Sequence, residues 1–560
     1  MRSTLRNPFV LAVALTASLG LAACGGDDSA GGGGGTGEAD TAAPSGGREG
    51  GEATFHYASF PDYLDPALSY TVGGWQALGT TNLPLLTYKR VEGSEGAELV
   101  PALAEAMPEV SDDGETYTLT LREGLEYSDG SPVKPSDFEH TIKRVLALES
   151  GGASFYQPID GADEYLEAGK NGGDISGITA DDATREITIK LKEPRGDFPF
   201  ILAMDFAGLV PGDTPFENMT SNPPAGVGPF KITGVTGTRE FVLEKNETYP
   251  EIPGVPAAKL NKITVDVVKN QERAVRDVLQ NTADYVDEPS PGDALREFRE
   301  QAPDRYSAET TNSTYYYFLN HQVKPFDDER VRQAVAHAID KRALQRLFGG
   351  LLQPGCNFLP PGMAGYEKID PCPHGNPDGS PKLDEARRLI EEAGATGERV
   401  KVYGNDEDPS KPVAEYLSSV MNEIGLEASP QIVEGSVYFQ TIGKQSTEAQ
   451  AGFANWFQDY PHPANFMFLV DGDSIQDVNN QNFGNVSVPE IDKALDEANS
   501  TPIEEAASMY AEVDRKLLEG SHVLPYGHRQ IPLITSDRIA FDQVVFHPVL
   551  QADFASFRLK

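Results

Sequence analysis

The chain has 560 residues, of which 39% are hydrophobic, 9% aromatic and 24% charged. This balance is typical of a globular protein with about two to four domains, and it excludes a small disulfide scaffold, a disordered chain and a multispanning membrane protein. The 46 Lys and Arg residues face 86 Asp and Glu residues, so the formal net charge is −40. Because no long basic run interrupts this acidic composition, we exclude nucleic acid as a partner.

The N-terminus predicts an export signal with a lipid attachment site. Two arginines precede an apolar run from Phe9 to Ala23, which is too short for a permanent membrane span of ~20 residues. The run ends in the letters LAAC, which resemble the lipobox of bacterial lipoproteins, where the cysteine is acylated. We therefore expect residues 1–23 to be a signal peptide and Cys24 to carry lipid. An ordinary secretory signal with an incidental cysteine is the alternative.

The segment that follows Cys24 predicts a flexible tether. Residues 25–51 comprise 27 positions, of which 12 are glycine, and they hold too few apolar side chains to repay the entropy of ordering. With the lipid on Cys24, residues 24–51 would join a folded domain to a membrane. We thus expect the protein outside the cytoplasm on the outer face of the cell membrane, or in the periplasmic space of a cell with two membranes.

The other two cysteines predict a disulfide. Cys356 and Cys372 lie in one loop-rich stretch, and exported pairs of this kind oxidise. A bridge that closes this loop would stabilise the fold by ~3 kcal/mol in the chain-entropy model. A zinc site is disfavoured because only His374 lies close and no C-x-x-C motif is present. No metal and no cofactor is predicted.

From residue 52 onward, strand and helix patterns mix without an internal repeat. Apolar and polar residues alternate over 116–121, 187–191 and 263–267, which predicts strands with one buried face. Apolar residues at helical spacing predict two helices that end just before Gly394 and Gly425, and a short strand is predicted near residues 400–403. Such a mixture is typical of an α/β protein.

Two further helices have more specific predicted boundaries. Ser136 and Glu139 fit a capping box, in which each side chain would bond the other residue's backbone N–H at a helix start. Asp327 or Asp328 can cap a second helix, which we expect to continue to the glycine pair at 349–350.

Several motifs together resemble one family of transport receptors. They are LDP at Leu64, LVPALA at Leu99, SDDGETYTLTLREGLEYSDGSPVKPSDF at Ser111, PAGVGPFKI at Pro224, PFDDERVRQAVAHAIDKRAL at Pro325 and WFQDYPHPANF at Trp456. This set is similar to the oligopeptide, dipeptide and nickel receptors of ABC importers, and the similarity spans most of the chain after residue 52. Each motif on its own is also compatible with plain scaffold, since turn glycines and packed helices explain it.

The resemblance implies a two-lobed periplasmic-binding-protein-like (Venus-flytrap) α/β fold with an extra subdomain on the first lobe. The solute-binding domain would occupy 52–560, and its lobes would be joined by strands that cross near Ser307 and Pro532. The expected parts are a first lobe of 52–81, 220–301 and 533–560, a subdomain of 82–219 and a second lobe of 310–531.

The resemblance also implies a ligand site centred on Asp459. In peptide-binding members, the aspartate of the matching W-x-x-D element pairs with the α-ammonium of the ligand, and a carboxylate in a dry cleft needs such a partner. The alternative is an aspartate that only caps the turn before Pro461. The other candidate ligand-binding residues are aromatic, and for them a core role is an equal alternative: Trp456, Tyr460, Tyr526, Phe155 and Tyr156.

The predicted function is that of a substrate-binding receptor, not an enzyme. It would capture peptides and deliver them, as a monomer, to an ABC permease and its ATPase. A non-peptide solute such as an oligosaccharide, a nickel chelate or a haem-like ligand is the first alternative. A secreted serine hydrolase is remote, because the S-x-x-K spacing of Ser131 and Lys134 lies in a proline-flanked loop without the motifs that accompany it.

Overall fold

The computed structural model describes residues 47–560 except for 149, 169–172, 375–379, 407–408 and 479. The predicted signal peptide, the predicted lipid site Cys24 and residues 25–46 of the predicted tether lie outside the described residues. Among the helices that are described, none combines the length and apolar character of a membrane span.

The first sheet comes from the segments predicted for the first lobe. Its five strands lie in the order β11 (Tyr285–Val286), β1 (Glu52–Tyr57), β10 (Lys262–Val267), β9 (Glu240–Lys245) and β8 (Phe230–Thr236). β1 is parallel to β10 and β11, whereas β8, β9 and β10 are antiparallel. The expected alternation is present in β10, where Ile263 and Val265 are buried. The helices of this region are α1 (Val72–Leu78), α6 (Gln271–Leu279) and α7 (Asp293–Gln301).

A second, antiparallel sheet forms the subdomain. Its order is β4 (Glu109–Val110), β5 (Thr116–Thr120), β7 (Glu186–Lys190) and β6 (Ile178–Asp181). Alternate residues of β5 and β7, including Leu119 and Ile187, are buried in a core that also contains Phe138 of the neighbouring helix α2. The subdomain helices are α2 (Ser136–Ala147), α3 (Ala153–Tyr156), α4 (Ala162–Ala168) and α5 (Phe198–Ile201).

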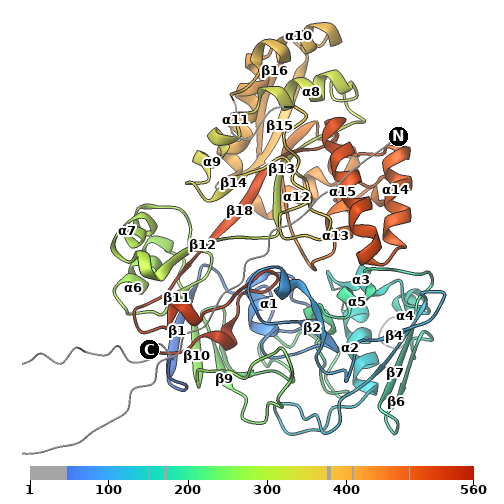
Figure 1. The fold of residues 1–560 in the computed structure, drawn as a ribbon, viewed down its shortest axis with the longest axis vertical. Coiled ribbons are helices and arrows are strands. Elements are labelled where there is room, and N and C mark those ends of the chain that lie inside the picture. Colours follow the sequence, from blue (N-terminus) through green and yellow to red (C-terminus); the bar gives the residue numbers. More distant parts are fainter. Residues whose placement is uncertain (1–46, 149, 169–172, 375–379, 407–408, 479) are drawn as a thin grey trace, which may run out of the picture. The chain divides into compact units, whose positions relative to one another are not determined.

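The largest sheet has seven strands and belongs to the second lobe (Figure 1). Its order is β12 (Tyr306–Thr310), β18 (Leu524–Ile534), β13 (Ser313–Leu319), β17 (Ala451–Phe457), β15 (Arg399–Asn405) and β16 (Glu427–Val433), and β14 (Leu352–Pro354) also pairs with β18. The helices are α8 (Glu329–Ala338), α9 (Lys341–Leu347), α10 (Leu383–Ala393), α11 (Ser410–Glu423), α12 (Tyr438–Ile442), α13 (Ala464–Met467), α14 (Pro489–Asn499) and α15 (Ile503–Glu519). Two short hairpins pair β2 (Leu86–Tyr88) with β3 (Leu99–Pro101) and β19 (Phe546–His547) with β20 (Gln551–Ala552).

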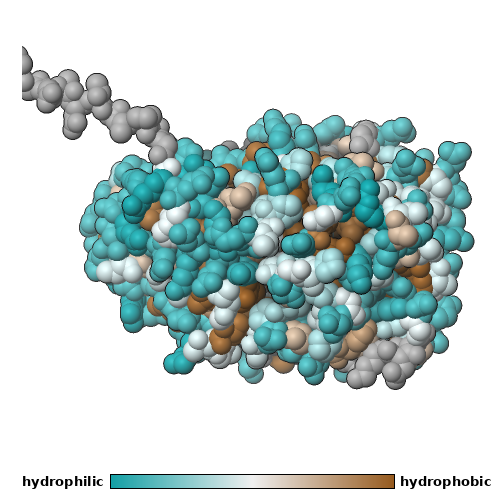
Figure 2. Space-filling view, turned by 90° about the horizontal axis from the view of Figure 1, so that it is seen from below, coloured by the Kyte–Doolittle hydropathy of each residue, from teal (hydrophilic) through white to brown (hydrophobic). Residues whose placement is uncertain are grey.

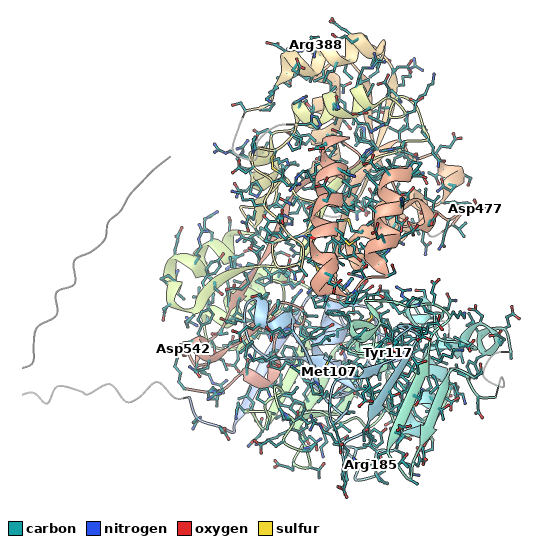
Figure 3. All side chains as sticks on the ribbon, turned by 45° about the vertical axis from the view of Figure 1, so that its right-hand side comes forward. Met107, Tyr117, Arg185, Arg388, Asp477 and Asp542 are labelled. Atoms are coloured by element: carbon teal, nitrogen blue, oxygen red, sulfur yellow. A yellow bond between two sulfur atoms is a disulfide. The ribbon has the colours of Figure 1, made fainter. Side chains whose placement is uncertain are left out.

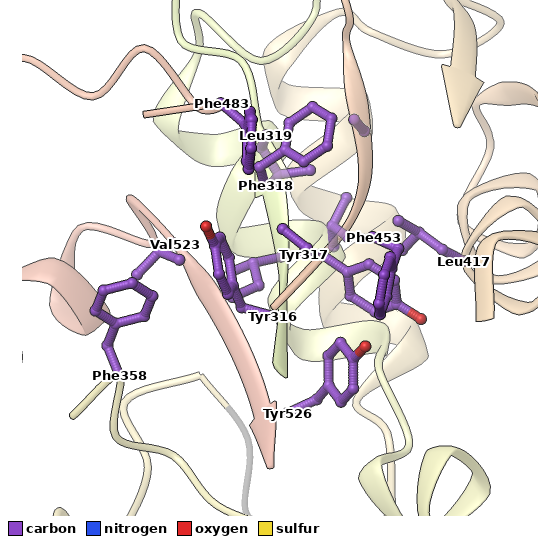
Figure 4. Packing of buried hydrophobic residues seen from close by; sticks show 14 of the residues in the cluster. Tyr316, Tyr317, Phe318, Leu319, Phe358, Leu417, Phe453, Phe483, Val523 and Tyr526 are labelled. Atoms are coloured by element: carbon purple, nitrogen blue, oxygen red, sulfur yellow. The ribbon is translucent and has the colours of Figure 1, made fainter. Parts of the chain in front are cut away.

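The core of the second lobe is centred on β13, whose seven residues are all buried. Figure 4 shows the side chains of Tyr316, Tyr317 and Phe318 among those of the neighbouring strands and loops. The outer surface differs strongly: in Figure 2, hydrophilic residues cover most of the face in view and hydrophobic residues form smaller patches.

The segments that connect the first and second lobes lie side by side. β12 pairs with the end of β18 in antiparallel register, with Ser307 opposite Leu533 and Ala308 opposite Pro532. Directly beyond β18, Thr535 forms a bridge to Tyr285 of β11 in the first sheet. The two predicted crossing positions are therefore neighbours in one ribbon.

Three local predictions are wrong. The capping box does not form: Ser136 bonds the carboxylate of Asp182 through its N–H and hydroxyl, and Glu139 accepts from Ile175 N at 2.8 Å. The helix expected up to residues 349–350 is two helices, α8 and α9, because Asp340 caps a new helix by accepting from two backbone N–H groups.

The third wrong prediction is the end of the tether, since ordered structure begins before residue 52. Arg48 N donates to Leu559 O at 2.7 Å and Gly50 N donates to Lys259 O at 2.6 Å. These backbone hydrogen bonds attach residues that the glycine-rich composition placed in the tether to the folded domain.

The structure brings Cys356 and Cys372 together in a disulfide, with their Cα atoms 5.8 Å apart. We expect purified protein that lacks residues 1–24, once denatured without reduction, to resist alkylation by iodoacetamide. After reduction, mass spectrometry should show two alkylated thiols, and the midpoint of unfolding should fall because ~3 kcal/mol of loop-closure stabilisation is lost. Two alkylated thiols before reduction would contradict the bond.

Candidate functional site

A cavity of about 1240 Å³ lies among the described residues. Its walls come from the loop after β1, from the subdomain around α3 and the segment after β7, and from β17, α13 and α14 of the second lobe. The lining includes Tyr70, Phe155, Glu193, Arg195, Asp197, Asn455, Trp456, Phe457, Asp459, Tyr460, Asn465, Asp496, Asn499 and Ser500. Such a volume lies above the usual range for small-molecule pockets and suits an extended ligand.

Asp459 lies two residues after β17 and is held in place by Asn465 of α13. Asp459 N donates to Asn465 Oδ1 at 2.8 Å, and Asn465 Nδ2 donates back to Asp459 Oδ2 at 2.8 Å. The hydroxyl of Tyr70 donates a further hydrogen bond to the carboxylate. The side chain is thus fixed from both sides while it faces the cavity.

Burial leaves the carboxylate of Asp459 without a compensating charge. The residue is 9% exposed, and desolvation raises its pKa to about 6, although the hydrogen bonds from Asn465 and Tyr70 act in the opposite direction. No basic side chain among the described residues forms an ion pair with it. A buried carboxylate in this position is costly unless a cation comes to lie beside it.

Aromatic side chains form the walls on either side of Asp459. Trp456 is half-buried, its Nε1 donates to Asn465 Oδ1 at 3.3 Å, and its ring lies 5.2 Å from that of Phe468. Phe155 is also half-buried and lies edge-on to Tyr460 at 6.2 Å between ring centroids. These rings offer apolar surface next to a fixed polar group, as ligand sites commonly do.

Tyr460 connects the second lobe to the subdomain. Its hydroxyl donates to Asp197 Oδ2 at 2.8 Å, and Asp197 also accepts two hydrogen bonds from Arg195, at 2.9 and 2.8 Å. Burial opposes ionisation of Asp197, but the neighbouring guanidinium of Arg195 outweighs it and lowers the pKa of this carboxyl. The only basic side chain among the described lining residues is thus already paired.

Two of the predicted aromatic ligand residues do not line the cavity. Tyr156 is fully buried in the subdomain core, where its hydroxyl donates to Ile201 O at 3.3 Å. Tyr526 is fully buried in β18 with its ring 4.8 Å from that of Tyr317, as Figure 4 shows. Both side chains belong to buried cores and neither is in the cavity lining, so they are not part of the proposed ligand site.

The structure adds residues that the sequence did not reveal. Tyr70 and the pair of Arg195 and Asp197 come from loops far from the Trp456 motif, and nothing in their local sequence distinguishes them. Asn465, in contrast, lies inside that motif, and its amide could have been recognised as a partner for the nearby carboxylate.

Comparisons with known proteins identify the fold and the family. The family model "Bacterial extracellular solute-binding proteins, family 5 Middle" matches residues 98–477. The chain belongs to this family. Its members include the receptors of ABC importers, so the predicted resemblance and the predicted two-lobed α/β fold are confirmed.

Individual relatives of this family 5 protein cover most of its length. The Dipeptide-binding protein DppE of Bacillus subtilis (strain 168) is 24% identical over 507 residues, which are 87% of this chain and 88% of the relative. Heme-binding protein A of Haemophilus influenzae is 25% identical over 459 residues, with 78% and 80% covered. The solved structure of Clavulanic acid biosynthesis oligopeptide binding protein 2 has a TM-score of 0.84 at 25% identity and covers 91% of this chain and 96% of its own. These relatives are binding proteins rather than enzymes.

Proposed function

We propose that this family 5 protein binds peptides with a free N-terminus and presents them to an ABC permease. The observation that carries the proposal is the buried carboxylate of Asp459, which faces a cavity of about 1240 Å³ and forms no ion pair with a basic side chain in the described part of the chain. An α-ammonium would supply the missing charge, whereas a blocked N-terminus would leave the carboxylate desolvated and unpaired.

The strand that leads to Asp459 supports a peptide ligand. β17 pairs with β13 along its whole length, but its other edge pairs with β15 only at Ala451 and Gly452. Further along, Asn455, Trp456 and Phe457 line the cavity. An extended peptide can use backbone groups of such a strand end, which gives affinity without reading side chains.

The decisive experiment compares matched ligands on the wild-type protein. We expect calorimetry to show that a short peptide with a free N-terminus binds at least about tenfold more tightly than its N-acetylated form, since the acetylated ligand cannot neutralise Asp459. Native mass spectrometry of the purified protein should show co-purified peptides. Equal affinity for both forms would refute the role of Asp459 and favour a non-peptide solute, an outcome that the haem-binding relative makes worth testing.

Binding should also depend on pH in a defined direction. The carboxylate of Asp459 is the binding form, its pKa is about 6, and the α-amino group of a peptide stays charged below pH 7. As the pH falls from 7 to 5, Asp459 takes up a proton, and we expect the affinity to fall by about tenfold. Calorimetry at both pH values measures this, and the Asp459→Asn variant should show a much flatter pH dependence. A wild-type affinity that does not change would contradict the assignment.

We also propose that lipid on Cys24 holds the protein at the membrane near its permease. The support is the LAAC sequence followed by a glycine-rich segment. Two acyl chains are enough for stable anchoring. We expect wild-type protein in the membrane fraction of a detergent-free lysate and the Cys24→Ser variant in the supernatant or retained only by an uncleaved signal, which immunoblotting distinguishes by size. Cleaved Cys24→Ser protein that stays with the membranes would contradict the anchor.

A further inference from the structure

The cavity lining holds more acidic than basic side chains, and this excess of negative charge bears on the choice of ligand. Four carboxylates, Glu193, Asp197, Asp459 and Asp496, face one basic side chain, Arg195, among the described lining residues. Arg195 and Asp197 neutralise each other through two hydrogen bonds of 2.9 and 2.8 Å. If Asp459 takes the α-ammonium of a peptide, Asp496 remains without an opposite charge in the lining, and Glu193 shares the one guanidinium, that of Arg195, with Asp197.

The segments that carry these two carboxylates meet in the wall of the cavity. Glu193 precedes the Arg195 pair in the subdomain, and Asp496 lies in the last turn of α14. Gly196 N donates to Asn499 O at 3.2 Å, which joins the two segments directly. The space is tight there, because a Cβ on Gly196 would lie 2.7 Å from Thr501 O. The subdomain segment that carries Glu193 and the C-terminal end of α14 are therefore direct neighbours.

The backbone of α14 adds to the negative potential at this end. Asp496, Asn499 and Ser500 all line the cavity, and they form the C-terminal end of an 11-residue helix. The aligned peptide dipoles place a partial negative charge at this end of a helix, which favours a nearby cation. The two carboxylates and the helix dipole thus both favour a cation.

From this arrangement we infer that the cavity selects peptides that carry a lysine or arginine side chain and rejects peptides with acidic side chains. The inference rests on the proposed function, since it assumes that Asp459 holds the N-terminus. A cationic side chain that extends from the peptide toward α14 meets Glu193 and Asp496. An acidic side chain meets the same two carboxylates and the negative helix end, with Arg195 already paired.

A peptide series on the wild-type protein tests the inference. Calorimetry at low ionic strength compares pentaalanine peptides in which one of positions 2 to 4 is lysine, glutamine or glutamate. At one or more positions, we expect the lysine peptide to bind about tenfold more tightly than the glutamate peptide, with glutamine between them, because attraction and repulsion both act at two carboxylates. The difference should shrink in high salt.

Variants then assign the preference to the two carboxylates. Glu193→Gln combined with Asp496→Asn should reduce the ratio of lysine to glutamate affinity to about threefold or less, with both affinities expressed relative to that of the glutamine peptide. Glu497→Gln is the matched control: it makes the same change of charge on the same helix, but Glu497 does not line the cavity. This control should keep the wild-type ratio.

The outcomes separate the inference from the proposed function. If free peptides bind but lysine, glutamine and glutamate give equal affinity, the charge preference is overturned and the peptide function stands. If the preference exists but persists in the double variant, the assignment to Glu193 and Asp496 is overturned. If N-acetylated and free peptides bind equally, the proposed function fails, whatever their side chains.

Discussion

Asp459→Ala is expected to weaken the binding of a peptide with a free N-terminus by about 2–5 kcal/mol, which is at least a tenfold loss of affinity. The reason is that the variant removes a buried carboxylate which Asn465 and Tyr70 hold toward the cavity. The peptide's ammonium would then be desolvated without its partner. Calorimetry with one peptide in its free and N-acetylated forms measures the effect, and the acetylated form should bind wild type and variant with similar affinity.

The control removes a carboxylate outside the cavity. Asp542 is exposed, as Figure 3 shows, and does not line the cavity, so Asp542→Ala should leave both affinities unchanged. If Asp459→Ala lowered the affinity for both forms of the peptide equally, its effect would be a loss of structure rather than of an ion pair. In that case Asp459 would not hold the ammonium.

Arg144→Leu is expected to lower the free energy of unfolding by about 3–5 kcal/mol, the largest stability effect of any substitution considered. Arg144 of α2 forms two hydrogen bonds to Asp65, at 3.0 and 2.8 Å, and neither side chain is exposed to solvent. The guanidinium also donates to Pro215 O and Glu217 O. The substitution leaves the carboxyl group of Asp65 buried without its partner, and urea denaturation followed by circular dichroism would detect the loss of stability.

Two further variants keep this prediction testable. Replacing both partners, Arg144→Leu with Asp65→Leu, should cost less than Arg144→Leu alone, because no unpaired charge stays buried. Arg388→Leu is the surface control: Figure 3 shows Arg388 on α10 at the outside of the molecule, and its pairs with Glu385 and Glu392 are exposed, so the cost should stay below about 1 kcal/mol. A loss below about 1 kcal/mol for Arg144→Leu would contradict the importance of the buried pair.

Regular elements were largely predictable because their signals are local. The alternation in β5, β7 and β10 matches their buried and exposed faces, and α10 ends at Gly394, whose φ of +67° suits glycine. The motif LDP at Leu64 is compatible with a scaffold role, and the structure agrees with that role, since Asp65 is the buried partner of Arg144.

Contacts between distant segments could not be predicted in the same way. Ser136 fits a local capping rule, but Asp182 competes for its N–H and hydroxyl from 46 residues away. The identity of Tyr526 as an aromatic residue does not say which face of β18 it occupies. The pairing of Arg195 with Asp197, which removes the one free cation from the described lining, depends on geometry that no motif encodes.

The paired crossing strands constrain how the lobes can move. Because β12 and β18 are hydrogen-bonded neighbours, with Ala308 opposite Pro532, a bend in one connection must bend the other at the same level. Pro532 has no N–H and gives the ladder no donor at this point, which softens the ribbon locally. Two independent connections would permit the lobes to twist and slide against each other. One ribbon instead favours rotation of the lobes about a single line. Each rotation that brings the lobes together would then return Asp459 and the subdomain wall to the same distance around a ligand.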